Sequence, residues 1–497
     1  MKNPDKDSPR AQSEAYRTFL GLLGAACGAI RLVCLDCKPF WADECFSAVM
    51  ARLKWKDFVL LLWSREANMT LYYLLLRGWI HFGQSEYFLR SLSVLFAAAT
   101  VPAIGWLGGQ LFGRRAGFIA AALFMFNAYS VRYSQEARSY ALFVLLATIS
   151  SGFLIAYLRA PTVKNRAGYI LVSVLAVYAH FYMLLLLAAH FLSLFWLDGL
   201  SDKARAGLRR AWVTIGICEV PLVIFIVKTR TRPILWIPRP GVRDLLEFFE
   251  HLSGGVNWLL PTAYLIAIAM ACARSNAKIH RQGWEAWRTQ FLLIWLLFPM
   301  LVTALLSAFL PVFLGRYLIF CLPALVILCA RGVTGLPYAW LRVAAVSAIL
   351  ALSVQGVLFA YGHDFDQERD AAGAATNFIL DHAEAGDGII LHFSLARAPY
   401  EFFRSKRAPT SRPEPEILYP RHGDALDYRD FRGVPTAALL QSAAPGHPRV
   451  WVMLMYAEEN GKPDPATEML GRVLLQAYPS LQRWEFPKVE LRLYSRN

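Results

Sequence analysis

The sequence carries too little charge for a soluble chain of its length. Only 18% of its 497 residues are charged, whereas 56% are apolar, and the mean hydropathy is +0.38. Soluble domains usually contain about 25% charged residues, so this composition excludes a soluble multidomain protein. It predicts a polytopic membrane protein.

Cysteine is also sparse, and none of the eight cysteines follows Cys329. Most lie within or beside apolar runs, which is not the pattern of a disulfide framework. Cys34 and Cys37 have the spacing of half a zinc site, but no second ligand pair accompanies them. We interpret these thiols as packed in the membrane, with a Cys37 to Cys45 bridge as the alternative on an oxidising face.

No glycine-rich phosphate loop, internal repeat or low-complexity segment is present. The first absence argues against a nucleotide-binding unit, and the second against a transporter built from repeated halves.

The net charge of +15 is unevenly distributed. Residues 1–361 carry 35 basic and 17 acidic residues, whereas residues 362–497 carry 16 and 19. The basic excess lies largely in short loops between apolar runs, as the positive-inside rule expects, so nucleic acid is not a predicted partner.

Apolar stretches predict about eleven spanning helices, starting from a cytoplasmic N-terminus. An odd number leaves the C-terminal region outside. The spans are placed at 18–37, 88–111, 116–133, 138–158, 168–179, 182–197, 211–228, 257–273, 289–308, 316–331 and 341–361.

We expect two domains. Residues 1–361 form the transmembrane domain, in which residues 38–87 are a first outer loop with interfacial helices. Residues 362–497 form a small soluble α/β domain on the periplasmic side. Its predicted strands are residues 388–393, 449–456 and 489–495. Its predicted helices are residues 371–385 and 465–478, and Asp464 is expected to cap the second of these.

Asp43 and Glu44 are adjacent carboxylates where the first predicted span ends. Asp43 precedes apolar residues spaced at i, i+3, i+4 and i+7, so one interpretation is that it caps an amphipathic surface helix. The alternative is catalysis at the membrane surface. Position alone favours the cap, but the rest of the sequence favours catalysis.

The segment from Ser134 to Tyr140 opens the fourth predicted span at the outer face. Ser134 could cap this helix, and its free N–H groups would hold an anion. Glu136 and Tyr140 would share one helix face at i, i+4. The alternative is an interfacial anchor in which Glu136 pairs with Arg138.

Two further segments are predicted at the same face. Arg316 and Tyr317 begin a span, where a guanidinium suits a lipid-bound phosphate or, alternatively, snorkels to the interface. His180 lies in an aromatic turn and could be structural. A protonated His180 would instead also hold a phosphate.

Four motifs together resemble the membrane glycosyltransferases of the GT-C fold, in the family 39 branch related to protein O-mannosyltransferases and lipid A aminoarabinose transferases. They cover most of the chain: Trp41-Ala42-Asp43-Glu44; Leu71 to Leu76 with Ser85-Glu86 and Leu89-Arg90; Leu111 to Gly117 leading to Ser134 to Arg138; and Arg316-Tyr317-Leu318 with Pro323. Relatives often have a Pro-Pro pair where this chain has Asn68-Met69-Thr70.

The resemblance implies an inverting transfer from a sugar on a polyprenyl phosphate. Asp43 would take the proton from the acceptor hydroxyl, and Glu44 or Glu136 would position the acceptor or a divalent ion. The remaining implied site residues bind the lipid phosphate (Arg138, His180, Arg316, Tyr317) or position the donor or acceptor (Gln135, Tyr72, Asn68). A divalent metal held by Asp43 and Glu136 is left open.

The predicted function is therefore a glycosyltransferase at the outer face of a bacterial inner membrane. Its expected partners are a polyprenyl-phosphate sugar donor, a glycan, lipid or protein acceptor, and membrane lipids. The alternative is a multi-pass transporter or flippase of lipid-linked sugars. Transporters usually bind at the midplane between repeated halves, whereas these acids are predicted at one surface.

Overall fold

The computed structural model describes residues 9–229, 239–276, 283–362, 369–407 and 413–496, except residues 424, 434, 444, 445, 457, 460 and 461. The chain forms two compact units. Unit 1 comprises Met1–Leu35, Arg65–Tyr72 and Arg90–Asp364, and unit 2 comprises Asp36–Ser64, Tyr73–Leu89 and Phe365–Asn497. The first outer loop therefore contributes to both units.

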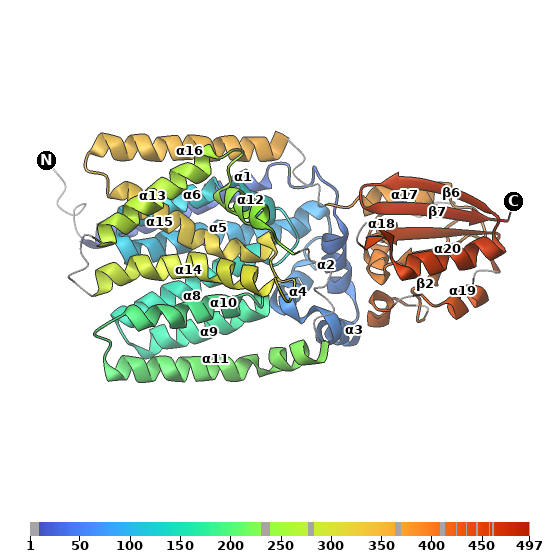
Figure 1. Ribbon diagram of the computed structural model, residues 1–497, viewed down its shortest axis with the longest axis horizontal. Helices are drawn as coiled ribbons and strands as arrows, with labels where there is room; N and C mark the ends of the chain where they lie inside the picture. Colours follow the sequence, from blue (N-terminus) through green and yellow to red (C-terminus); the bar gives the residue numbers. More distant parts are fainter. Residues whose placement is uncertain are drawn as a thin grey trace. The chain divides into compact units, whose positions relative to one another are not determined.

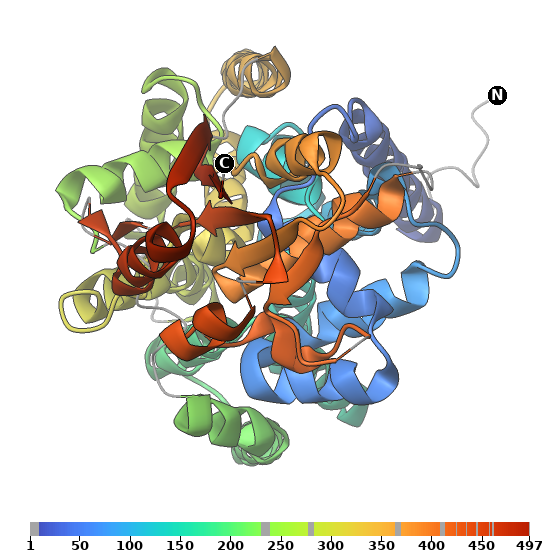
Figure 2. The same ribbon diagram turned by 90° about the vertical axis from the view of Figure 1, so that its right-hand side faces the viewer.

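Unit 1 is a bundle of helices that run side by side, lengthwise in Figure 1 and nearly end-on in Figure 2. Its helices are α1 (Pro9–Leu32), α5 (Glu86–Phe112), α6 (Arg114–Met125), α7 (Ala128–Ser134), α8 (Tyr140–Arg159), α9 (Val163–Ala179), α10 (Met183–Ser193), α11 (Asp202–Thr229), α12 (Val242–Ser253), α13 (Leu259–Asn276), α14 (Trp284–Leu306), α15 (Leu322–Thr334) and α16 (Ala339–Gly362).

Within the described residues, six helical stretches are long and apolar enough to cross a membrane: Glu86–Phe112, Tyr140–Arg159, Asp202–Lys228, Trp284–Leu306, Gly315–Thr334 and Ala339–Gly362. The other predicted spans fall on α1, α6 with α7, α9, α10 and α13. The chain is thus a polytopic α-helical membrane protein, as predicted.

The predicted span 116–133 is wrong as one continuous helix, because α6 ends at Met125 and α7 begins at Ala128. Asn127 lies at the break. Its side-chain oxygen accepts the Ser130 N–H at 2.8 Å, and its amide nitrogen donates to the carbonyls of Leu252 and Ser253 at 3.0 and 2.9 Å. Asn127 is the N-cap of α7, and Phe126 before it is the C-cap of α6.

The first outer loop contains short helices: α2 (Ala42–Arg52), α3 (Trp55–Leu61), η2 (Leu62–Glu66), η3 (Ala67–Met69) and α4 (Thr70–Trp79). Several apolar side chains of this loop stay exposed, including Trp55 at 59% and Phe82 at 80%. Exposed tryptophan and phenylalanine on or just after short helices are typical of segments that lie in a membrane interface.

Unit 2 contains a five-stranded sheet of order β2-β1-β3-β7-β6. β1 pairs in parallel with β2 and β3, while β7 runs antiparallel to both β3 and β6. The strands are β1 (Gly388–His392), β2 (Glu416–Tyr419), β3 (Arg449–Met455), β6 (Ser480–Phe486) and β7 (Val489–Ser495).

Helices cover both faces of this sheet. On one face, α17 (Ala372–His382) packs Ile379 against Ile389 and Trp451, and on the other α20 (Pro465–Ala477) packs Leu470 and Leu474. Alternation of side chains along β1 and β3 supplies apolar residues to both faces, as a doubly covered sheet requires. The remaining helices of this segment are α18 (Arg397–Lys406) and α19 (Ala437–Ala443).

The predicted α/β character of residues 362–497 is confirmed. The three predicted strands correspond to β1, β3 and β7, and the two predicted helices to α17 and α20. The predicted cap is also confirmed, because Asp464 accepts the N–H groups of Ala466 and Thr467 at 2.9 and 3.2 Å.

The cysteine interpretation needs correction. Cys34 and Cys37 are disulfide-bonded rather than free thiols. Cys45 is a free, fully buried thiol, so the alternative bridge between Cys37 and Cys45 is wrong. Cys34 and Cys37 therefore form a disulfide, although their spacing is also that of a metal-binding pair.

Candidate functional site

The turn that joins α9 to α10 places His180 inside unit 1. α9 ends at Ala179 and α10 begins at Met183, so residues 180–182 form a tight connection. Asn68 of η3 holds this turn, because its side-chain oxygen accepts the N–H of Phe181 at 2.8 Å. Asn68 thus supports the turn.

The His180 ring is fully buried among aromatic rings. It stacks on Phe143 with centroids 5.0 Å apart and meets Tyr317 edge-on at 4.7 Å. The N–H of Tyr182 donates to its Nδ1 at 3.2 Å. Nδ1 is therefore an acceptor, and in the neutral ring the proton resides on Nε2.

The His180 imidazole is neutral. Burial, together with the charges of Arg138 and Arg316, lowers its pKa to about 3. A protonated His180 is disfavoured in the ligand-free protein, because a third cation beside these groups would have to overcome both burial and two guanidiniums. Phosphate binding by His180 stays a prediction. What His180 can offer an anion is a neutral N–H donor.

Two predictions about residues 134–140 are wrong, because the chain bends between α7 and α8. Ser134 ends α7 and donates to the Val131 carbonyl at 2.8 Å, so it does not cap α8. Glu136 lies in the bend before α8, which begins at Tyr140. Glu136 and Tyr140 therefore do not share a face of one helix.

Arg138 lies in this bend and is anchored through its backbone. Its N–H donates to the Glu136 carbonyl at 2.8 Å, and its own carbonyl accepts the Ser93 hydroxyl at 3.2 Å. Ser93 in turn contacts the hydroxyl of the buried Tyr72 at 3.2 Å. Tyr72 thus supports the backbone of Arg138 from a second layer.

Arg316 and Tyr317 come from the helical turn η6 (Gly315–Cys321), which leads into α15. The Arg316 guanidinium lies 5.9 Å from the Tyr317 ring centroid, and its residue is 8% exposed. Tyr317 also contacts Tyr182, with centroids 5.3 Å apart. A bend, a turn and a helix start thereby converge on one location.

We call this group, formed by Arg138, Ser139, His180, Arg316 and Tyr317, the His180 cluster. Two of its polar atoms, His180 Nε2 and Ser139 Oγ, are buried and find no hydrogen-bond partner among the residues that the structure describes. A buried donor without a partner costs about 1–3 kcal/mol, so such atoms are candidates for contact with a ligand or a water molecule. Ser139 was missed by sequence analysis, although it directly follows Arg138.

Gln135 and Glu136 have different surroundings. The Gln135 amide nitrogen lies within 3.0 Å of three oxygens, the carbonyls of Arg31 and Val33 and the hydroxyl of Tyr361. This amide joins the ends of α1 and α16 and has no donor left for a ligand. Glu136 is buried, with 2% exposure.

Asp43 and Glu44 belong to unit 2. α2 begins at Ala42, and its N-cap residue is Trp41, so Asp43 lies in the first turn and does not cap the helix. The capping interpretation of Asp43 is therefore wrong. Glu44 is fully buried, while Asp43 is partly exposed. Carboxylates in a first helical turn are stabilised by the positive end of the helix dipole.

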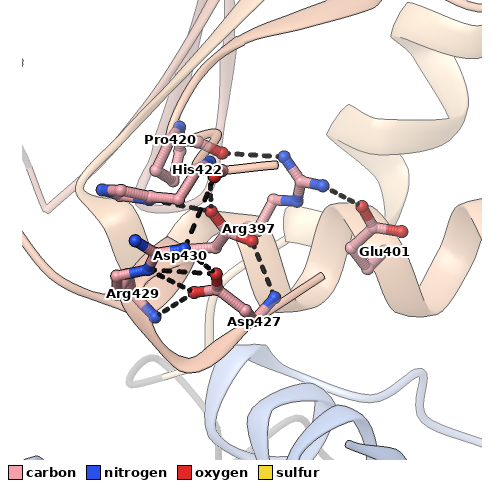
Figure 3. A network of polar contacts seen from close by, with 7 residues as sticks. All are labelled: Arg397, Glu401, Pro420, His422, Asp427, Arg429 and Asp430. Atoms are coloured by element: carbon pink, nitrogen blue, oxygen red, sulfur yellow. Dashed lines mark hydrogen bonds and ion pairs between the residues drawn. The ribbon is translucent and has the colours of Figure 1, made fainter. Parts of the chain in front are cut away.

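Among the described residues, one group of three side chains is close enough to share a metal ion, namely His422, Asp427 and Asp430 of unit 2. Figure 3 shows how its carboxylates are used. Asp427 accepts from Arg429 Nη2 at 2.6 Å and Nε at 3.0 Å, and Asp430 accepts from His422 Nδ1 at 3.0 Å and the Asp427 N–H at 2.9 Å.

These contacts do not fit a cation site. A guanidinium already supplies positive charge to Asp427, and its hydrogen bonds hold the pKa of that carboxyl below its usual range despite some burial. The group instead stabilises the short helix η8 (Tyr428–Phe431), whose N-cap is Asp427. Nearby, Arg397 donates to the Pro420 carbonyl at 2.8 Å and pairs with Glu401 at 2.7 Å (Figure 3).

No protein-family model and no curated protein sequence matches the chain. Solved structures do. ArnT from Cupriavidus metallidurans in the apo state aligns with a TM-score of 0.64 at 12% identity, over 97% of this chain and 99% of that chain. The same protein bound to undecaprenyl phosphate gives a TM-score of 0.62 at 12% identity, over 96% and 98%. At this identity the similarity establishes the fold, and this chain is a polytopic membrane protein with the GT-C fold.

Proposed function

We propose that this protein is an inverting glycosyltransferase that moves a sugar from a polyprenyl-phosphate donor to a hydroxyl acceptor at the outer face of a bacterial inner membrane. The observation that carries the proposal is the His180 cluster. In it two guanidiniums accompany the buried donors His180 Nε2 and Ser139 Oγ, which have no hydrogen-bond partner within the described part of the chain. Phosphate is the anion that such a set of donors suits. The fold similarity to ArnT bound to undecaprenyl phosphate supports the same ligand class.

In the proposed reaction, a carboxylate oxygen of Asp43 removes the proton from the acceptor hydroxyl as its oxygen attacks the anomeric carbon of the sugar. The bond between that carbon and the phosphate oxygen breaks, and the lipid phosphate departs with the bonding electrons. Attack opposite the leaving group inverts the anomeric centre. Glu44 or Glu136 would position the acceptor.

The His180 cluster would stabilise the departing phosphate. Arg138 and Arg316 supply fixed positive charge, while His180 Nε2 and Ser139 Oγ supply hydrogen bonds. Such groups act strongly in a water-poor pocket, because their dipoles are already oriented before the charge develops. Tyr72 and Asn68 would act by holding Arg138 and the His180 turn in place.

The outer, oxidising location is supported by the bonded Cys34 and Cys37 at the end of the first predicted span. Disulfides persist in compartments such as the bacterial periplasm and are rare in the cytosol. A divalent ion held by Asp43 and Glu136 stays a prediction. A transfer assay with and without EDTA would test it.

The experiment separates binding from transfer. The full-length protein in proteoliposomes is supplied with undecaprenyl-phosphate sugars, and the glycosidic products are identified by mass spectrometry. We expect Asp43→Asn to abolish transfer while binding of undecaprenyl phosphate persists, and Arg138→Gln to lose binding. Arg209→Gln, an exposed arginine of α11, is the matched control.

Two results would overturn the proposal. One is near-normal transfer by Asp43→Asn. The other is transbilayer movement of the glycolipid with no glycosidic bond formed, which would instead identify a transporter.

A further inference from the structure

The first N–H group of α2 is bound by a residue from the distant C-terminal segment. Both carboxylate oxygens of Asp370 lie within hydrogen-bond distance of the Ala42 N–H, at 3.1 and 3.3 Å, across 328 residues of sequence. Helix starts leave such N–H groups without intrahelical partners, and Trp41 at the N-cap provides no side-chain bond. Asp370 therefore caps α2 from another part of unit 2.

Asp370 is itself fixed by two further hydrogen bonds. The Tyr456 hydroxyl, just after β3, donates to its Oδ2 at 3.0 Å, and the N–H of Ala372 at the start of α17 donates to its Oδ1 at 3.2 Å. The residue is only 7% exposed. Three donors hold this carboxylate in one position. It therefore also fixes the position of the helix start that it caps.

Packing around this cap is also shared between the two segments. Ala42 belongs to the apolar core that contains Ala372, Ile379 and Trp451. The Phe40 ring stacks on that of Phe402 in α18, with centroids 5.0 Å apart. The start of α2 is thus built on the C-terminal α/β segment and not on its own loop alone.

The same location concentrates negative charge. Asp43 and Glu44 follow Ala42 directly, and Glu86 accepts the Phe40 N–H at 3.2 Å while it pairs with Lys406. Burial raises the pKa of the Cys45 thiol well above its usual value, and the carboxylates of Asp370, Glu44 and Glu86 raise it further. Burial also raises the pKa of Asp370, hydrogen bonds from Ala42, Tyr456 and Ala372 lower it, and the charge of Asp43 raises it.

We propose that Asp370, braced by Tyr456, is a positioning residue for Asp43, and that the C-terminal α/β segment thereby orients the catalytic base. This inference rests on the proposed role of Asp43. The physical reason is that Ala42 and Asp43 are adjacent. The hydrogen bond that fixes the backbone of Ala42 therefore also restricts the backbone of Asp43. A displacement of about 1 Å at a reacting group can cost about 100-fold in rate.

The test compares two substitutions of Asp370 in the full-length protein in proteoliposomes. Asp370→Ala removes the cap, whereas Asp370→Asn retains an oxygen that can accept the Ala42 N–H. We expect Asp370→Ala to lower kcat about 100-fold while binding of undecaprenyl phosphate changes less than about twofold. Asp370→Asn should recover at least about tenfold of that loss.

Tyr456→Phe removes only the brace and should lower kcat by a smaller factor, with KM for the donor unchanged. Asp464→Ala is the matched control, because it removes another aspartate N-cap from unit 2 that does not contact α2. A purely structural role for Asp370 would lower the amount of folded protein and leave kcat per folded molecule unchanged, as we expect for Asp464→Ala.

The inference is overturned if Asp370→Ala keeps kcat within about twofold, or if Asp370→Asn and Asp370→Ala lose activity equally. If Asp370→Ala does not fold, the comparison between Asp370→Asn and Tyr456→Phe decides, since neither removes an apolar contact. Failure of the proposed function looks different, because Asp43→Asn would then retain transfer.

Discussion

The side-chain oxygen of Asn68 accepts the backbone N–H of Phe181 at 2.8 Å, although 113 residues separate them. This bond joins η3 to the turn that carries His180. Sequence analysis gave Asn68 a place near the donor or acceptor, at the point where related chains often have a proline pair. The structure gives it a definite contact, with the backbone of the His180 turn.

Asn68→Ala should therefore weaken binding of undecaprenyl phosphate. The substitution leaves the Phe181 N–H unpaired, at a cost of about 1–3 kcal/mol, and frees the turn. We expect about a tenfold loss of affinity, measured by tryptophan fluorescence or native mass spectrometry. Asn68→Asp keeps an acceptor oxygen and is the control. Equal affinity in Asn68→Ala and the unmodified protein would show that the tether is dispensable.

Arg138→Gln and Arg316→Gln should each reduce sugar transfer. Removing one preformed donor to a developing negative charge costs about 100-fold or more in kcat. The corresponding lysine variants keep the charge but lose the planar fork, so they should fall between the glutamine variants and the unmodified protein. Initial rates in proteoliposomes measure this. Unchanged rates in both glutamine variants would remove the His180 cluster from the reaction.

His180 should contribute no ionisation to the rate between about pH 5 and 8, because its pKa lies near 3 in the folded protein. The pH profiles of kcat/KM for the unmodified protein and His180→Gln should then have the same shape. A limb near pH 6.5 that disappears in His180→Gln would contradict the neutral assignment.

The same pKa shift affects stability. The unfolded histidine binds a proton below about pH 6.5, whereas the folded one stays neutral down to about pH 3. The unfolded state therefore gains protons first, and burial of His180 should lower stability as the pH falls through this interval. The thermal midpoint of His180→Gln should consequently fall less on acidification than that of the unmodified protein. An identical fall in both proteins would contradict this prediction.

Asp464→Ala should destabilise the start of α20. Asp464 accepts two N–H groups of the first turn and also the Thr467 hydroxyl. Loss of an aspartate cap costs about 1 kcal/mol, which corresponds to roughly a fivefold change in a local opening equilibrium. Hydrogen–deuterium exchange of residues 465–477 measures this opening. Asp464→Asn retains capping ability and should exchange more slowly than Asp464→Ala.

The fold was largely predictable because its main signals are local. Long apolar runs identify spans wherever they occur, and alternating apolar residues identified β1, β3 and β7. The strands that were missed have weak signals: β2 has four residues, and β6 alternates polar and partly exposed residues such as Gln482 and Arg483. Their place in the sheet depends on their neighbours.

The site was less predictable because its geometry depends on breaks in helices. The pattern from Ser134 to Tyr140 is compatible with one continuous helix, and nothing local in the sequence signals the bend in which Arg138 lies. The contact between Asp370 and Ala42 carries no local signal at all. The roles of Arg138, His180, Arg316 and Tyr317 at a lipid phosphate were implied by the resemblance to GT-C glycosyltransferases, and they stay a prediction.

Unit 2 is discontinuous in the chain, and this has a consequence for biosynthesis. Its first two segments, residues 36–64 and 73–89, leave the ribosome early, but the sheet of the same unit is encoded in the last quarter of the chain. Asp370, which caps α2, is synthesised only about 280 residues after the end of the second segment. Closing so long a loop carries an entropic cost. Truncation before β3 would leave the nascent first loop without its core, so quality-control proteases should degrade such fragments.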